Sequence, residues 1–244
     1  MSGVTFIDRH GKTLADYDRP SVAVDTALLT LPPGGQLSVV LVKDSGAGDW
    51  RLPGTFLHLR ETLAAAVRRS LNVKAGVSGR SPKQLHVFDD PKRDDRGWVL
   101  SVAHLDAVPF ADLVIDPGLA RVTPIAEVGQ LRFDHDEIIR RAVAKLREDY
   151  EEHPDPAGLA GDCFTLRALQ RVHQAVKGEP IMRDTFRRVM KLQLIETGEH
   201  DSGSVGKPAA LFRKRARSGD GRNASRAIGS RSAVGRQGSR TKRK

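Results

Sequence analysis

The 244-residue chain has very little cysteine and few aromatic residues. Its single cysteine, Cys163, excludes an internal disulfide and fits a reducing cytoplasm. Aromatic residues make up 5% of the sequence, and no apolar run approaches the roughly 18 residues that a membrane span needs. The N-terminus also lacks the apolar segment of a secretory signal. We therefore expect a soluble, cytoplasmic protein with no membrane partner.

Positive charge is concentrated at the C-terminus. The formal net charge is +10, but residues 213–244 hold twelve Lys or Arg and one Asp, so the first 212 residues carry about −1. This tail is rich in Gly, Ser and Arg without an apolar period, so it cannot bury enough surface to offset chain entropy. We expect residues 216–244 to be disordered and to attract nucleic-acid phosphates. Solvation or a subcellular address are the alternatives.

The first 150 residues alternate apolar runs with turn signals. Ser21–Leu31 and residues 36–43 flank a Pro-Pro-Gly-Gly turn, which predicts a β-hairpin. Further strands are expected at 84–88 and 98–107. Helices are expected at 62–71 and at 134–150, where apolar residues recur at helical spacing. Strands with few interleaved helices favour an α/β sandwich.

Beyond an acidic, Pro-containing segment, the pattern changes to a small helical unit. Thr165 is the expected N-cap of a first helix. The buried stripe of that helix is predicted to comprise Leu166, Leu169, Val172 and Val176. A second helix at 182–192 is predicted to direct inward Phe186, Val189 and Met190. Strands at 194–197 and 209–212 then flank a Gly-rich loop, an order typical of a winged helix-turn-helix.

The second helix carries four cations on its outward side. Arginine's planar fork suits two-point hydrogen bonding to a guanine edge or a phosphate, and lysine supplies a point charge. A solvated surface stripe is the alternative interpretation. The predicted DNA-contacting residues are Arg183, Thr185, Arg187, Arg188, Lys191 and, on the wing, Lys207.

Residues 55–77 keep the frame of the motif G-x5-E-x7-R-E-U-x-E-E-x-G-U, in which U is an apolar residue. Five residues are in register: Glu61, Arg69, Leu71, Gly76 and Val77. Four positions depart from it. Thr55 replaces the first glycine, and the three acids of the second half are replaced by Ser70, Val73 and Lys74. The segment thus resembles a Nudix box that has lost the three carboxylates of its second half. A plain amphipathic helix is the alternative.

The lost acids matter because offsets of three and four place them on one helix face. Clustered carboxylates there would hold a divalent metal ion against a diphosphate. Mg²⁺ prefers hard oxygen ligands, which neither Val73 nor Lys74 supplies. We therefore expect no catalytic residue, no metal site, no cofactor and no hydrolase activity.

In their order along the chain, these segments resemble the NrtR family, which comprises Nudix-related transcriptional regulators of NAD metabolism. The resemblance covers about residues 17–213 and leaves out the basic tail. Its segments are 17–25, 50–54, the altered box, 90–97 with Ser101, 133–135, 164–170, 186–188 and 206–209. It implies a Nudix-type α/β/α sandwich followed by a small winged helix-turn-helix domain. The expected divisions are a sensing domain at 1–155, a linker at 156–163, a DNA-binding domain at 164–215 and the tail at 216–244.

The resemblance also implies roles for single residues. Glu61 and Arg69 are expected to pair and hold the box together without taking part in catalysis. The predicted effector-binding residues are Arg51, Arg60, Lys74, Asp94 and Arg96. Lys74 would place an ammonium where hydrolases hold a metal, unless it is a surface lysine, and Asp94 with Arg96 equally fits an ordinary turn. We expect His135 to cap or pack a helix and Cys163 to be buried at the domain junction.

The function implied is a homodimeric, ligand-responsive repressor of genes for NAD synthesis or salvage. It would bind a palindromic operator in double-stranded DNA and sense ADP-ribose or a related NAD metabolite. The first alternative is a hydrolase of ADP-ribose-like nucleoside diphosphates with relocated metal ligands. Acids available for such a site are Glu61, Asp89, Asp90, Asp94 and Asp95. The second alternative is a nucleic-acid-coating protein that binds mainly through its tail.

Overall fold

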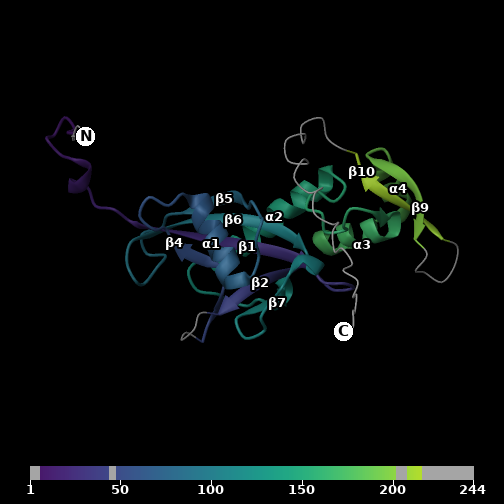
Figure 1. Ribbon diagram of the computed structural model, residues 1–244, viewed down its shortest axis with the longest axis horizontal. Helices are drawn as coiled ribbons and strands as arrows, with labels where there is room; N and C mark the ends of the chain where they lie inside the picture. The colour runs from purple at the N-terminus through teal and green to yellow at the C-terminus, as the bar shows by residue number, and fades with distance from the viewer. Residues whose placement is uncertain (1–5, 44–47, 202–207, 216–244) are drawn as a thin grey trace, which may run out of the picture. The chain divides into compact units, whose positions relative to one another are not determined.

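The computed structural model describes residues 6–43, 48–201 and 208–215. Within these residues, seven strands form one mixed sheet (Figure 1). They are β1 (Ser21–Leu31), β2 (Ser38–Lys43), β3 (Trp50–Arg51), β4 (Gly54–Phe56), β5 (Lys83–Phe88), β6 (Val99–Pro109) and β7 (Ala120–Pro124). The main order is β3-β2-β1-β6-β5, with β4 paired to β1 and β7 paired to β2. The predicted β1–β2 hairpin is confirmed by antiparallel pairing of Leu29 with Val39.

The central strand β1 is buried on both faces. It pairs in parallel with β6 over its full length, from Ser21 opposite Val99 to Leu31 opposite Pro109. Because side chains alternate along a strand, Val24 and Leu28 enter one apolar cluster while Leu29 enters the other. This double burial explains why β1 reads as a nearly continuous apolar run.

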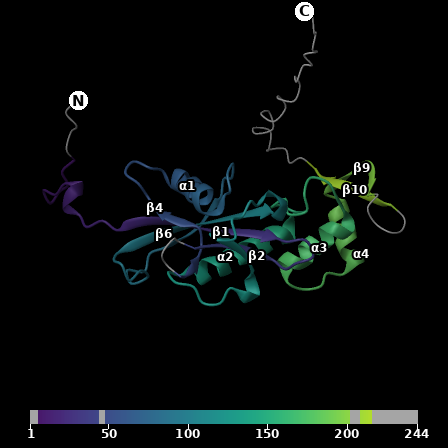
Figure 2. The same cartoon turned by 60° about the horizontal axis from the view of Figure 1, so that its bottom comes forward.

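One helix covers each face of the sheet, as Figure 2 shows. The helix α1 (Leu63–Ala75) begins at Thr62, whose hydroxyl accepts a hydrogen bond from the Ala65 amide. It ends at Gly76, whose φ of 64° is left-handed and where an added Cβ would lie 2.6 Å from the Val114 carbonyl oxygen. The helix α2 (His135–Glu152) packs on the opposite face. Short 3-10 segments lie at Leu14–Asp16, Phe110–Asp112 and Ile125–Glu127.

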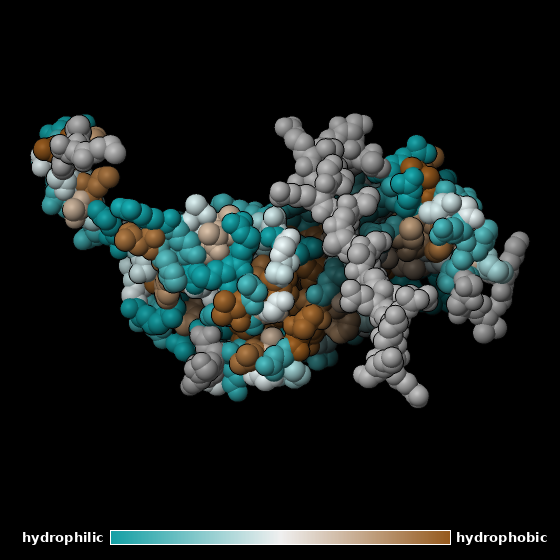
Figure 3. All heavy atoms as spheres, in the orientation of Figure 1, coloured by the Kyte–Doolittle hydropathy of each residue, from teal (hydrophilic) through white to brown (hydrophobic). Residues whose placement is uncertain are grey.

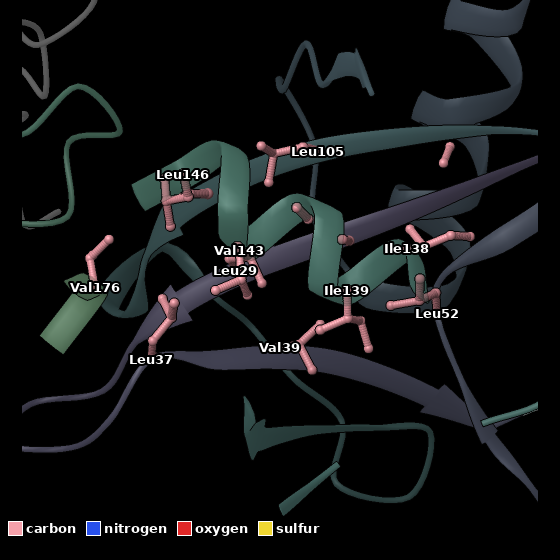
Figure 4. Packing of buried hydrophobic residues seen from close by; sticks show 14 of the residues in the cluster. Leu29, Leu37, Val39, Leu52, Leu105, Ile138, Ile139, Val143, Leu146 and Val176 are labelled. Atoms are coloured by element: carbon pink, nitrogen blue, oxygen red, sulfur yellow. The ribbon is translucent and has the colours of Figure 1, made fainter. Parts of the chain in front are cut away.

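The larger core lies between α2 and the sheet (Figure 4). Its labelled members on α2 are Ile138, Ile139, Val143 and Leu146, which meet Leu29, Val39 and Leu105 of the sheet. Burying one such aliphatic side chain contributes about 1.5–3 kcal/mol. The core therefore holds the apolar face of α2 against this face of the sheet. On the molecular surface seen in Figure 3, hydrophilic side chains dominate, and apolar side chains gather in smaller areas.

The C-terminal part has the predicted order of two helices and a hairpin. Its elements are β8 (Phe164–Thr165), α3 (Leu166–Lys177), α4 (Arg183–Lys191), β9 (Leu194–Asp201) and β10 (Ala209–Lys214). The sheet order is β8-β10-β9. The Thr165 cap is confirmed, since its hydroxyl accepts from the Ala168 amide at 3.1 Å. The expected α/β sandwich followed by a winged helix unit is thus observed.

Two local expectations need correction. Cys163 is exposed rather than buried, because the burial is taken by its neighbour Phe164. Val189 is 45% exposed, since Phe186 and Met190 fill the inward face of α4. His135 is confirmed as a packing residue, because it is buried in the first turn of α2, directly after the N-cap Asp134. The expected linker segment packs Ala157, Leu159 and Ala160 against the large core.

Candidate functional site

A cavity of about 300 Å³ opens between the end of α1, the β3–β4 turn and the start of α2. Its charged lining residues are Asp25, Arg51, Lys74, Arg93, Asp94 and Arg96. Four cationic side chains face two carboxylates, which leaves an excess of two positive charges. Such a lining favours an anionic ligand.

Asp25 forms the floor of this pocket and is 7% exposed. Its carboxylate accepts a hydrogen bond from the Ser101 hydroxyl at 2.5 Å. Burial raises the pKa of Asp25, but His135, Ser101 and Arg93 together bring that pKa below its ordinary value. Gly54 lies opposite on β4, where an added Cβ would be 1.9 Å from the Asp25 Oδ1. The glycine therefore lets β4 approach a buried anion.

His135 ties the start of α2 to this floor. Its Nδ1 accepts a hydrogen bond from the Leu52 amide at 3.1 Å, so the ring proton resides on Nε2. That Nε2 lies 3.4 Å from the Asp25 Oδ1. The histidine is 2% exposed and acts as a packed polar bridge between the β3–β4 turn and β1.

The predicted pair of Glu61 and Arg69 is present. The guanidinium meets the carboxylate at two points, Nε to Oε1 at 2.9 Å and Nη2 to Oε2 at 2.7 Å. Arg69 also donates to the Thr55 hydroxyl at 3.0 Å and to the Phe56 carbonyl at 2.9 Å. The hydrogen bond from Arg69 is the main reason why the pKa of Glu61 falls to about 2. Thr55 thus replaces a glycine and contributes a hydroxyl that braces the loop.

The three positions that lost acids lie in different environments. Ser70 is 2% exposed, and its hydroxyl has no hydrogen-bond partner among the described residues. Val73 is 73% exposed. Lys74 alone lines the pocket; burial lowers its pKa, and Arg51 lowers it further. Across residues 6–43, 48–201 and 208–215, no three His, Cys, Asp or Glu side chains are grouped to hold a metal ion.

An aromatic clamp holds Arg96 at the pocket. Its guanidinium binds the buried Asp94 carboxylate at two points, at 2.8 and 2.7 Å. Its Cζ lies 5.2 Å from the Phe56 ring centroid and 4.6 Å from that of Phe133. About half of the Arg96 side chain stays exposed. Ion pairing and stacking together fix the direction of this cation while leaving surface for a ligand.

A second, larger groove of about 810 Å³ lies beside α4. Three cations of α4 spaced by four residues, Arg183, Arg187 and Lys191, line it together. The start of α3 adds Arg167 and Gln170 to the lining. The Gln170 side-chain amide donates to the Ile181 carbonyl at 2.8 Å, which holds the turn between α3 and α4. The groove therefore presents cations from both helices to a polyanion.

Comparison with known proteins decides the family. The family described as NrtR DNA-binding winged helix domain matches residues 156–214. The crystal structure of Shewanella oneidensis NrtR complexed with a 27mer DNA is 31% identical, with a TM-score of 0.67, and covers 80% of this chain and 93% of that one. The chain belongs to the NrtR family.

Two curated relatives extend this result. This NrtR-family chain is 28% identical over 214 residues to the ADPR responsive transcriptional repressor NtrR of Acinetobacter baylyi, covering 82% of this chain and 84% of the relative. It is also 30% identical over 129 residues to the ADP-ribose pyrophosphatase of Methanocaldococcus jannaschii. That match covers 51% of this chain and 73% of the pyrophosphatase.

The pocket of this NrtR-family chain gathers four of the five residues predicted to bind an effector. Arg51, Lys74, Asp94 and Arg96 line it, whereas Arg60 is exposed, has a φ of 61°, and lies outside the lining. The lining also includes Asp25, Arg93 and Phe133, which were not predicted as pocket residues. A detectable signal existed for Asp25, which is the single charged residue within the apolar run of β1.

The residues of α4 predicted to contact DNA do not all lie on one face of the helix. Arg183, Arg187 and Lys191 share the groove, and Arg188 is exposed outside its lining. Thr185 lies on another side of the helix, where it lines a cavity with Phe186 and Val189. Lys207 and the tail at 216–244 lie outside the described residues. Among the helices that the structure describes, none is long and apolar enough to cross a membrane.

Proposed function

We propose that this protein is a transcriptional repressor that binds double-stranded operator DNA and responds to ADP-ribose or a closely related NAD metabolite. It acts as a homodimer on a palindromic site near genes of NAD synthesis or salvage. One observation carries the proposal: the same chain combines a cationic pocket, on a box that lacks three metal-binding acids, with a cationic groove on a winged helix.

The ligand assignment rests on charge and on the relatives. A diphosphate bears negative charge that complements the two excess positive charges of the pocket. Phe56 and Phe133 add flat apolar surface beside Arg96. The Acinetobacter baylyi repressor is named for its response to ADPR, and the Methanocaldococcus jannaschii relative is named for acting on ADP-ribose. Both names support ADP-ribose as the ligand of this pocket.

Binding without turnover is the second part of the proposal. Hydrolysis of a diphosphate in a Nudix site needs carboxylates that hold divalent metal. Ser70, Val73 and Lys74 stand in their places, and Glu61 is engaged by Arg69. Asp94, one of the acids available for a relocated site, is engaged by Arg96. These pairings favour a sensor over a hydrolase.

The enzymatic alternative is tested by incubating the protein with ADP-ribose and Mg²⁺ or Mn²⁺ and measuring AMP. We expect no AMP above the uncatalysed background. Turnover near 1 per second, the low end for ordinary enzymes, would establish the hydrolase instead.

DNA contact is assigned to the outer face of α4. Arg183, Arg187 and Lys191 reach the groove together, and Arg188 adds a fourth exposed cation. Each well-placed two-point contact with a base is worth about 1–3 kcal/mol of discrimination. Phosphate contacts by the remaining cations supply affinity without sequence preference.

A protection experiment on the DNA upstream of the protein's own gene tests the function directly. We expect a discrete, two-fold symmetric footprint that disappears when ADP-ribose is added. Uniform protection of any duplex would instead favour the nucleic-acid-coating alternative. Absence of protection on every upstream region tested would refute the proposal that the protein is a repressor.

A further inference from the structure

One helix, α2, reaches from the ligand pocket to the winged helix. Its first residue, His135, lines the pocket, and its N-cap Asp134 pairs with the pocket residue Arg93 at 2.9 Å. α2 has 18 residues, so its axis is roughly 27 Å long at about 1.5 Å per residue. No Gly or Pro interrupts it, which allows it to move as one rigid element.

At its other end, α2 meets a buried polar cluster. The Tyr150 hydroxyl donates to the Asp155 carboxylate at 2.6 Å. That carboxylate also accepts from the Leu159 and Ala160 amides at 2.8 and 3.0 Å. The Asp155 carbonyl accepts from the Lys214 ammonium of β10 at 2.8 Å. Asp155 thus joins α2, the following segment and the last strand of the winged helix.

The same cluster continues through α3 to α4. The Asp155 amide donates to His173 Nε2 at 3.4 Å. The His173 ring contacts the Tyr150 ring edge-on at 4.9 Å between centroids, and it contacts the Phe186 ring in the same way at 4.9 Å. Phe186 is the buried residue that precedes Arg187 on α4. A continuous chain of contacts therefore connects α2 with the DNA-facing helix.

Two properties make this cluster sensitive to the position of α2. Asp155 is fully buried and has a φ of 47°, a left-handed conformation that is uncommon outside glycine, asparagine and aspartate. Burial lowers the pKa of His173 to about 4, so the ring is neutral near pH 7 and accepts a hydrogen bond at Nε2. Burial and Asp155 raise the pKa of Tyr150, so its hydroxyl remains a donor.

We propose that Tyr150, Asp155 and His173 form a coupling junction through which ligand binding at the start of α2 changes the position of α4. This inference rests on the proposed function and identifies the residues that connect the ligand pocket with α4. A ligand that contacts Phe133 and His135 acts on the first turn of α2. The rigid helix carries the displacement to Tyr150, and the ring contacts pass it to Phe186. The junction is thus a set of positioning residues that touch neither ligand nor DNA.

The experiment measures the coupling factor, which is the ratio of operator affinities of the full chain without and with saturating ADP-ribose. Such factors generally lie between about 5 and 150. Tyr150→Phe removes the hydroxyl and keeps the ring. We expect this variant to bind operator alone and ADP-ribose alone within about threefold of the original chain. We expect its coupling factor to fall below about a third of the original value.

The matched control is Tyr17→Phe, which removes the other tyrosine hydroxyl of the sequence and its bond to Asp8 in an exposed segment. Its coupling factor is expected to equal that of the original chain. His173→Gln, which keeps an acceptor and loses the ring contacts, provides a second junction variant if Tyr150→Phe proves unstable. If a folded junction variant keeps the full coupling factor, the inference about the junction is overturned while the proposed function stands. If ADP-ribose leaves operator binding of the original chain unchanged, the proposed function fails as well.

Discussion

Replacing Lys74 with methionine removes one positive charge from the pocket and keeps much of the apolar stem. At about 4 Å, two unit charges interact by about 4 kcal/mol at an effective dielectric constant of about 20. Lys74 is only partly buried, so solvent screening reduces this to roughly 1.5–2 kcal/mol. ADP-ribose affinity should therefore fall by roughly 10- to 30-fold. Chelation of divalent metal should leave the affinity of the original chain unchanged.

Calorimetric titration of ADP-ribose in EDTA, at low and at moderate salt, measures this effect. Arg68→Met is the matched control, because it removes a cation from an exposed position of the same helix. We expect its affinity to stay within about twofold of the original. Equal affinities for Lys74→Met and Arg68→Met, or a strict requirement for Mg²⁺ in the original chain, would refute the electrostatic account of the pocket.

Three further predictions concern single positions. Ser70→Ala removes a buried hydroxyl without a described partner, so thermal unfolding should show unchanged or higher stability, by up to about 1 kcal/mol; a clear loss would reveal a hidden partner. Because folding depresses the pKa of Glu61 to about 2, its stabilising effect is full above about pH 4.5 and disappears toward pH 2. Stability should therefore fall more steeply over this range in the original chain than in Glu61→Gln, and parallel curves would contradict the pairing. Arg187→Ala combined with Arg188→Ala should weaken operator binding by about 1–3 kcal/mol for each base-reading arginine, and unchanged affinity at physiological salt would exclude this face of α4.

Local signals in the sequence predicted the elements whose causes are local. The Pro-Pro-Gly-Gly turn specified the β1–β2 hairpin, and Thr165 specified the start of α3. The resemblance to the Nudix box implied the ion pair of Glu61 and Arg69, two residues that lie close together in the chain. These features depend on residues that are neighbours in the chain, so they can be predicted without the structure.

Features that depend on distant segments were not predictable in the same way. The parallel pairing of β1 with β6 joins residues far apart in sequence, and the apolar run of β1 indicates burial without indicating which strand is its partner. The pocket role of Asp25 appears only when Ser101 and His135 fold onto it. Cys163 was expected inside on the basis of residue type, but Phe164 takes that place. The junction at Asp155 was likewise hidden, because a Pro-containing acidic segment reads as a linker.

We propose that the ligand pocket and the DNA groove are energetically coupled. The most direct measurement is ADP-ribose affinity of the full chain, determined with and without saturating operator DNA. Because coupling is reciprocal, operator should weaken ADP-ribose binding by the same factor by which ADP-ribose weakens operator binding. We expect equal factors of at least about 5 in both directions. ADP-ribose affinity that is identical with and without operator would contradict it.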